Sequence, residues 1–163
     1  MEILSLYDDN GNEINETIKR GIKPEKGNIM ISIIFIKNKE GKYLIQKTSK
    51  EKGSEYSTTG GHVSKGETPL KTIIRETKEE LGLAIIEKEI KYIGIEKPSK
   101  KPILFSIYET KKEIDLSKLK LQKEEVESVE WLTKEKINSL IDKNKFRKNT
   151  GIIFKKIYKG KYK

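Results

Sequence analysis

Residues 60–83 read GGHVSKGETPLKTIIRETKEELGL, and this stretch predicts a loop, then a short helix, then a second loop. The loop residues that let the backbone turn tightly and approach a ligand closely are Gly60, Gly61 and Gly66. Thr68 is a good helix N-cap, and Pro69 stands at the first helical position, where a missing N–H costs nothing. Gly82 has the position of a C-cap glycine, so we expect the helix to end just before it.

The predicted helix has one apolar side and one acidic side. Its apolar positions recur at helical spacing and are Leu70, Ile73, Ile74, Thr77 and Leu81. Glu76, Glu79 and Glu80 follow an i, i+3, i+4 pattern, which predicts three carboxylates together on an exposed helix face. Arg75 can reach Glu79 one turn further along. Such a cluster beside a glycine loop suits Mg²⁺, which takes oxygen ligands, while a solvated acidic face is the alternative interpretation.

The spacing of particular residues along the stretch carries a more specific signal. From Gly61 there are five residues to Glu67, and then seven residues to the run RETKEELGL, which begins at Arg75. This pattern resembles the Nudix box, G-x5-E-x7-R-E-U-x-E-E-x-G-U, where U is a bulky aliphatic residue. Thr77 is the one departure, at a position that the helix is expected to bury. The resemblance implies that Glu67, Arg75 and Gly82 are structural residues of the box.

Resemblance to this family implies hydrolysis of a nucleoside diphosphate linked to another group, or of a similar small-molecule diphosphate. It implies Mg²⁺ or Mn²⁺ as cofactor, held by Glu76, Glu79 and Glu80, which are also the expected catalytic residues. The backbone carbonyl of Gly61 is a further expected ligand. Metal-activated water would attack phosphorus, and Glu79 or Glu80 would take its proton.

Three positions outside the helix are further candidates. In many family members a glutamate from the segment before the last strand joins the metal site, and here Glu125 is the first choice and Glu124 the second. A solvated acidic loop is the alternative for both. His62, the single histidine, is expected to bind substrate, or else to fill a polar pocket. We expect substrate recognition in the loops 47–59 and 97–102.

Composition limits the class of protein. The chain has 163 residues, enough for one domain with a core. It contains no cysteine, which excludes disulfides, a thiolate metal site and a cysteine nucleophile. No run approaches the roughly 18 apolar residues of a membrane span, and the acidic N-terminus lacks a signal-peptide pattern. We therefore expect a cytoplasmic protein with no membrane contact.

The net charge of +10 comes from 35 Lys and Arg residues against 25 Asp and Glu residues. Lysine is abundant throughout, so a general compositional bias explains most of this excess. A denser basic end consists of Lys145, Arg147, Lys148, Lys155, Lys156, Lys159, Lys161 and Lys163. Contact of this end with RNA or with another phosphate-rich ligand is one interpretation, although no nucleic-acid motif accompanies it.

The order of apolar runs predicts the α/β class. Residues 1–28 form a strand-and-turn extension, and strands follow at 29–36, 43–46, 89–96, 103–110 and 126–132. The first of these reads as a buried central strand that forms a hairpin with the second. Residues 133–163 are expected to hold two helices, over 133–142 and 151–158. The resemblance sharpens this to the Nudix fold, an α/β/α sandwich around a mixed β-sheet, with residues 1–163 as a single domain.

Two other functions stay open. A Nudix fold without catalysis could serve as a nucleotide- or RNA-binding module. The residues LYDDNGN, followed later by GGH, also resemble the branch related to type I isopentenyl-diphosphate isomerase. In those isomerases a cysteine stands beside the glycine–histidine pair, where this chain has Gly60, so hydrolysis is favoured over isomerisation. Family relatives often form homodimers, and a homodimer is therefore an expectation here as well.

Overall fold

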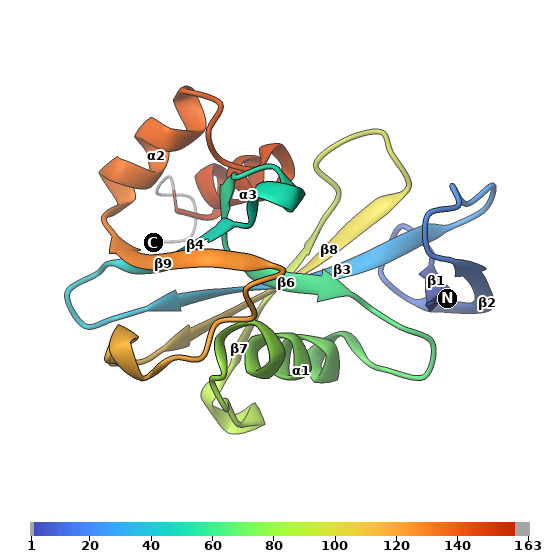
Figure 1. The fold of residues 1–163 in the computed structure, drawn as a ribbon. Helices are drawn as coiled ribbons and strands as arrows, with labels where there is room; N and C mark the ends of the chain where they lie inside the picture. Colours follow the sequence, from blue (N-terminus) through green and yellow to red (C-terminus); the bar gives the residue numbers. More distant parts are fainter. Residues whose placement is uncertain (1, 159–163) are drawn as a thin grey trace.

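The computed structural model describes residues 2–158, in which nine strands form one mixed sheet with helices on both faces (Figure 1). The strands are β1 (Ile3–Tyr7), β2 (Glu13–Lys19), β3 (Asn28–Lys37), β4 (Tyr43–Thr48), β5 (Tyr56–Ser57), β6 (Thr59–His62), β7 (Lys91–Glu96), β8 (Ile103–Lys111) and β9 (Val126–Leu132). The helices are α1 (Pro69–Leu81), α2 (Lys134–Asp142) and α3 (Lys148–Tyr158), with 3-10 turns η1 (Lys50–Lys52), η2 (Glu87–Glu89) and η3 (Leu116–Lys118). No helix in this range is long and apolar enough to cross a membrane.

Strand β3 is the centre of the sheet, as its continuous apolar run predicted. One edge pairs in parallel with β8 along its length, and the other pairs antiparallel with β1, β6 and β4 in turn. Ile33 and Phe35 pack into the core under α2 and α3, whereas Ile34 and Ile36 pack into the core under α1. Because successive side chains of a strand point to opposite faces, one apolar run supplies both cores.

The two cores make three layers. Figure 1 shows α1 on one face of the sheet and α2 with α3 on the other. Ile73 and Leu81 of α1 are fully buried against the first face, and Ile137 and Phe154 are fully buried against the second. The predicted α/β/α sandwich around a mixed sheet is confirmed.

The hairpin predicted between β3 and β4 is wrong for most of its length. The two strands share a single residue pair, Lys37 with Tyr43. Strand β6 already covers the edge of β3 from Ile31 to Ile34, so β4 can join β3 only at its end. Strand β4 pairs instead with β9 and β5, and the two halves of the sheet splay apart beyond the turn.

The glycine pair that was predicted to open a loop lies in strand β6 instead. A Cβ on Gly60 would stand 2.6 Å from the carbonyl oxygen of Ser32 on the neighbouring strand. Glycine is therefore required here for close strand approach rather than for a turn. The turn comes later, at Gly66, whose φ is +86°.

The termini follow the prediction with small shifts. Strands β1 and β2 form the N-terminal hairpin expected within residues 1–28. Helix α2 has Thr133 as its N-cap, which accepts a hydrogen bond from the backbone N–H of Lys136. Helix α3 starts at Lys148, earlier than the predicted residue 151. The remainder of the predicted C-terminal helical region, 159–163, lies outside the described residues, and so do three lysines of the basic end.

Candidate active site

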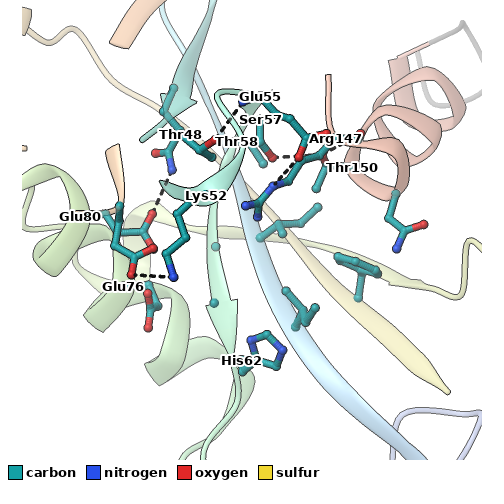
Figure 2. A pocket seen from close by; sticks show the side chains of 18 of the residues that line it. Thr48, Lys52, Glu55, Ser57, Thr58, His62, Glu76, Glu80, Arg147 and Thr150 are labelled. Atoms are coloured by element: carbon teal, nitrogen blue, oxygen red, sulfur yellow. Dashed lines mark hydrogen bonds and ion pairs between the residues drawn. The ribbon is translucent and has the colours of Figure 1, made fainter. Parts of the chain in front are cut away.

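A cleft of about 530 Å³ opens where β4 and β6 separate, between helix α1 and the start of α3 (Figure 2). Its acidic end is lined by Glu76, Glu79, Glu80 and Glu125. Its other end is lined by Glu2, Arg20, His62, Arg147, Lys148 and Asn149. Figure 2 shows Glu76 and Glu80 on one side of the cleft and Arg147 and Thr150 across from them. The splayed sheet thus places acidic residues of the predicted box opposite a basic wall.

Helix α1 has the ends that the sequence predicted, and these ends fix its position. The Thr68 side chain accepts a hydrogen bond from the N–H of Lys71, and Pro69 is the first helical residue. Gly82 has φ +68°, the left-handed conformation that closes a helix, and its N–H donates to the carbonyl of Lys78. Thr77 is fully buried at the position where the box has an aliphatic residue, and its hydroxyl donates to the carbonyl of Ile73.

The three glutamates of α1 differ sharply in exposure. The side chain of Glu79 is 46% exposed and that of Glu76 is 18% exposed, whereas Glu80 as a residue is only 7% exposed. The prediction that all three lie on an exposed face is therefore wrong for Glu80. The sheet beside the helix covers this residue, a tertiary contact that helical spacing does not reveal.

Glu80 is held by strand β4. Nε2 of Gln46 donates to Oε1 of Glu80 at 3.0 Å, and the side-chain oxygen Oε1 of Gln46 accepts from Oγ1 of Thr59 at 2.9 Å. Burial raises the pKa of Glu80 to about 9, and the nearby carboxylates of Glu76 and Glu125 act in the same direction. A carboxylate at this position is costly unless a positive charge joins it.

Arg75 links the box internally. Its Nε and Nη2 donate to the two oxygens of Glu67 at 2.7 and 2.9 Å. Its Nη1 donates to Glu76 at 2.9 Å and to Glu79 at 3.0 Å. Thr72 adds a hydrogen bond to Glu67 at 2.9 Å, and the Arg75 guanidinium lowers the pKa of Glu67. These bonds fix the direction of the acidic side chains.

The backbone at Gly61 lies directly against Glu76. A Cβ added to Gly61 would overlap the Cγ and Cδ atoms of the Glu76 side chain. The absence of a side chain at residue 61 therefore makes the space in which the Glu76 carboxyl lies. The Glu76 carboxyl and the backbone of β6 are therefore adjacent, as they would need to be to bind one cation together.

Glu125 approaches from outside the helix. It lies just before β9 and lines the cleft, and its Oε1 is 3.6 Å from Nζ of Lys52 in η1. Its backbone is fixed, because the N–H of Ser49 donates to its carbonyl at 3.1 Å. Glu124 is exposed and does not line the cleft. Of the two glutamates considered from the sequence, the structure brings Glu125 to the box.

Within residues 2–158, no group of three or more His, Cys, Asp or Glu side chains is arranged closely enough to hold a metal ion. The expected three-carboxylate site is therefore not preformed, because Arg75 and Lys52 draw carboxylates into ion pairs. The donor set still fits a hard divalent cation. A buried carboxyl with a raised pKa, two more carboxyls beside it and the space left at Gly61 all favour added positive charge.

His62 lies on β6, towards the end of the cleft away from Glu80 (Figure 2). Burial lowers the pKa of His62 to about 4, Arg20 and Arg147 lower it further, and Glu2 opposes them. The imidazole is thus neutral at neutral pH and offers one donor and one acceptor.

Gln46 and Arg20 line the cleft but were missed in the sequence, whereas Lys52 lies in the predicted loop 47–59 and Arg147 in the predicted basic end. The loop 47–59 does line the cleft, as expected, but the loop 97–102 does not. A single polar residue in an apolar strand, such as Gln46 after LI in YLIQ, is the one signal that could have pointed to the site. Arg20 is a charged residue without a local pattern.

The comparisons with known proteins agree with the fold. A family model described as NUDIX domain matches residues 28–151. An uncharacterized Nudix hydrolase of Listeria innocua is 32% identical, over 90% of this chain and 88% of that protein. A solved structure from Deinococcus radiodurans superposes with a TM-score of 0.80 at 20% identity, covering 96% of this chain and 99% of that one. A MutT protein from Methanosarcina mazei Go1 gives a TM-score of 0.67 at 20% identity, covering 86% and 100%.

Proposed function

The chain belongs to the NUDIX family of hydrolases, which act on diphosphate bonds, and from this premise we propose that it is a Mg²⁺-dependent enzyme. Its proposed substrate is a nucleoside diphosphate linked to another group, or a similar organic diphosphate. The observation that carries the proposal is the meeting of Glu76, Glu79 and Glu80 of α1 with Glu125 at one end of a single cleft. Arg75 and Lys52 pair with three of these carboxylates, whereas the buried Glu80 is hydrogen-bonded by the neutral amide of Gln46, so a further positive charge would be favoured there.

Five oxygen donors would be available to hold the ion: the carboxylates of Glu76, Glu79, Glu80 and Glu125 and the backbone carbonyl of Gly61. Such hard donors suit Mg²⁺ or Mn²⁺. When bound, the ion offsets the negative charge that develops on the diphosphate oxygens as the P–O bond breaks. Arg75 keeps Glu76 and Glu79 in place through its bonds to Glu67, and in this role it is a positioning residue rather than a catalytic one.

Glu79 is our first assignment for the base that takes the proton of the attacking water. Its side chain is the most exposed of the three on α1, so water reaches it, and Arg75 fixes its direction. Glu80 is the second assignment, because Gln46 holds it deeper in the cleft. His62, which is neutral, would hydrogen-bond the part of the substrate beyond the diphosphate.

A panel of organic diphosphates, incubated with Mg²⁺ in ¹⁸O-labelled water and followed by phosphorus NMR, tests the proposal. We expect turnover that a chelator abolishes, with label in one product phosphate. Glu79→Gln and Glu80→Gln should each lower kcat by about 10²-fold or more. The control is Glu87→Gln, since this exposed glutamate of η2 does not line the cleft. Metal-independent turnover, or full activity in both variants, would refute the assignment.

The alternative, a nucleotide- or RNA-binding module, predicts a different outcome of the same panel. Such a module would bind a diphosphate compound without releasing any phosphate product. Its affinity for RNA would fall steeply with salt, because the contacts would come from lysines and arginines.

A further inference from the structure

The end of the cleft opposite the box glutamates carries an excess of positive charge. Arg20, Arg147 and Lys148, called here the cationic end, line it together with two acidic residues, Glu2 and Glu55. Within the described residues, no acidic side chain forms an ion pair with Lys148. The two ends of the cleft therefore carry opposite net charge.

Arg20 reaches the cleft from outside the region that matches the family model, which begins at residue 28. Nη1 of Arg20 donates to Oε1 of Glu2 at 3.0 Å, and the Arg20 N–H donates to the Glu2 carbonyl at 3.0 Å. Ser64, two residues after β6 ends, donates to the other oxygen of Glu2. The N–H of Lys65 also donates to the carbonyl of Ile3 at 2.8 Å. The N-terminal hairpin is thus attached to the cleft wall, and it holds Arg20 in place there.

Arg147 comes from a distant part of the chain, directly before α3. Its N–H donates to the carbonyl of Tyr56 at 2.9 Å, and its own carbonyl accepts from Gly151 at 2.8 Å. Its Nε is 3.7 Å from Oε1 of Glu55, at the long end of an ion pair. The guanidinium groups of Arg20 and Arg147 therefore both keep N–H donors available for a ligand.

The cleft is also lined by apolar side chains, from Ile31, Ile33 and Phe105. We infer that the cationic end binds an anionic group on the part of the substrate remote from the diphosphate, with Arg20 as the specificity-determining residue. This inference rests on the proposed function and names a substrate class: diphosphates whose second half carries a carboxylate or a phosphate. The apolar lining accommodates the uncharged portion between the two anionic parts.

The guanidinium group of Arg20 is suited to binding a carboxylate or phosphate. A guanidinium presents donors in a plane and binds carboxylate or phosphate through two bonds at once. One donor of Arg20 is used by Glu2, and the side chain remains 53% exposed. The competing explanation is an ion pair that merely fastens the hairpin to the wall. If the cationic end binds an anion, removing the charge of Glu2 should strengthen anion binding, because Glu2 repels an incoming anion. If the ion pair only fastens the hairpin, removing that charge should not strengthen anion binding.

Calorimetric titration with inorganic phosphate, at constant ionic strength, tests the inference on the full chain after divalent metals have been removed on a chelating resin. Without metal the box carboxylates repel phosphate, so the titration reports on the cationic end alone. We expect wild-type protein to bind phosphate and Arg20→Gln to bind it about tenfold more weakly. Glu2→Gln should bind it more tightly, and Arg20→Lys should fall between wild type and Arg20→Gln.

Lys26→Gln is the matched control, because Lys26 pairs with Glu16 at 3.5 Å in the same N-terminal region but does not line the cleft. Its phosphate affinity should equal that of wild type. If wild-type protein binds no phosphate, or if Arg20→Gln and Glu2→Gln change the affinity in the same direction, the inference fails. That failure is separable from the hydrolase proposal, which is tested by turnover with Mg²⁺. Circular dichroism confirms in each case that the variant is folded.

Discussion

Nε2 of Gln46 lies 3.0 Å from Oε1 of Glu80, so an amide on strand β4 donates to the buried carboxyl of helix α1. The Gln46 side chain also accepts from Oγ1 of Thr59 on β6, so it links β4, β6 and α1 at the acidic end of the cleft. The bond to Glu80 by itself favours the ionised carboxylate, but burial and the neighbouring carboxylates of Glu76 and Glu125 outweigh it and raise the pKa of Glu80.

Glu80→Gln should stabilise the metal-free protein, and increasingly so as the pH rises. Burial raises the pKa of Glu80 from 4.5 to about 9, so between these values the folded state binds more protons than the unfolded state. The contribution of Glu80 to wild-type stability must therefore fall with rising pH across this window, whereas glutamine does not titrate. Urea unfolding of metal-free protein at about pH 6 and about pH 8.5 measures the difference. A difference that stays constant or shrinks at the higher pH would contradict the prediction.

The same pair of proteins should respond differently to Mg²⁺. A ligand that binds only the folded state stabilises it, and the wild-type carboxylate supplies a charge that glutamine lacks. We expect Mg²⁺ to raise the Tm of wild-type protein substantially and that of Glu80→Gln much less. Equal increases would remove Glu80 from the set of metal ligands.

Gly61→Ala should reduce metal-dependent turnover by about 10²-fold, because the new methyl group would displace the Glu76 carboxyl. Gly66→Ala is the matched control on the following loop. Its φ of +86° makes alanine unfavourable by about 1 kcal/mol, but nothing lies within 4 Å of the added Cβ. We therefore expect a lower Tm with near-normal kcat. If both variants lose activity equally, strain in the loop and not contact with Glu76 is responsible.

Sequence reasoning identified what local signals determine. The caps at Thr68 and Gly82 and the apolar run of β3 depend on residues close together in the chain, and these elements were predicted correctly. The displacement of β4 from β3 depends on β6 reaching the same edge first, a long-range competition that no local pattern records.

The candidate site likewise has residues that local sequence patterns predict and residues that only the tertiary structure brings together. The carboxylates of α1 follow from helical spacing, whereas the burial of Glu80 depends on Gln46, a residue 34 positions away. Arg20 and Arg147 meet the same cleft from opposite ends of the chain. Arg20 is an isolated charged residue in a lysine-rich sequence, so only the folded structure distinguishes it, whereas Arg147 belongs to the basic end predicted from the sequence.

Arg75→Lys should lower kcat by about 10–100-fold, because an ammonium cannot bind both oxygens of Glu67 while also reaching Glu76 and Glu79. Glu67→Gln should have a similar effect, since Arg75 would lose its charged anchor. A double-mutant cycle on kcat checks the shared cause. We expect the double variant to be little worse than either single one, and fully additive losses would mean that the two residues act independently.

Glu125→Gln should weaken the apparent affinity for Mg²⁺ by about tenfold or more, whereas Glu124→Gln should leave it unchanged. The two glutamates are adjacent in sequence, but only Glu125 lines the cleft and acts on the pKa of Glu80. The backbone around both is fixed by Ser49, whose N–H and hydroxyl donate to their carbonyls, so neither substitution should shift the loop. Turnover measured across a range of Mg²⁺ concentrations, at saturating substrate, gives the affinity for each variant. Equal weakening in the two variants would point to the net charge of the loop, and no weakening in Glu125→Gln would leave only the α1 carboxylates and the Gly61 carbonyl as ligands.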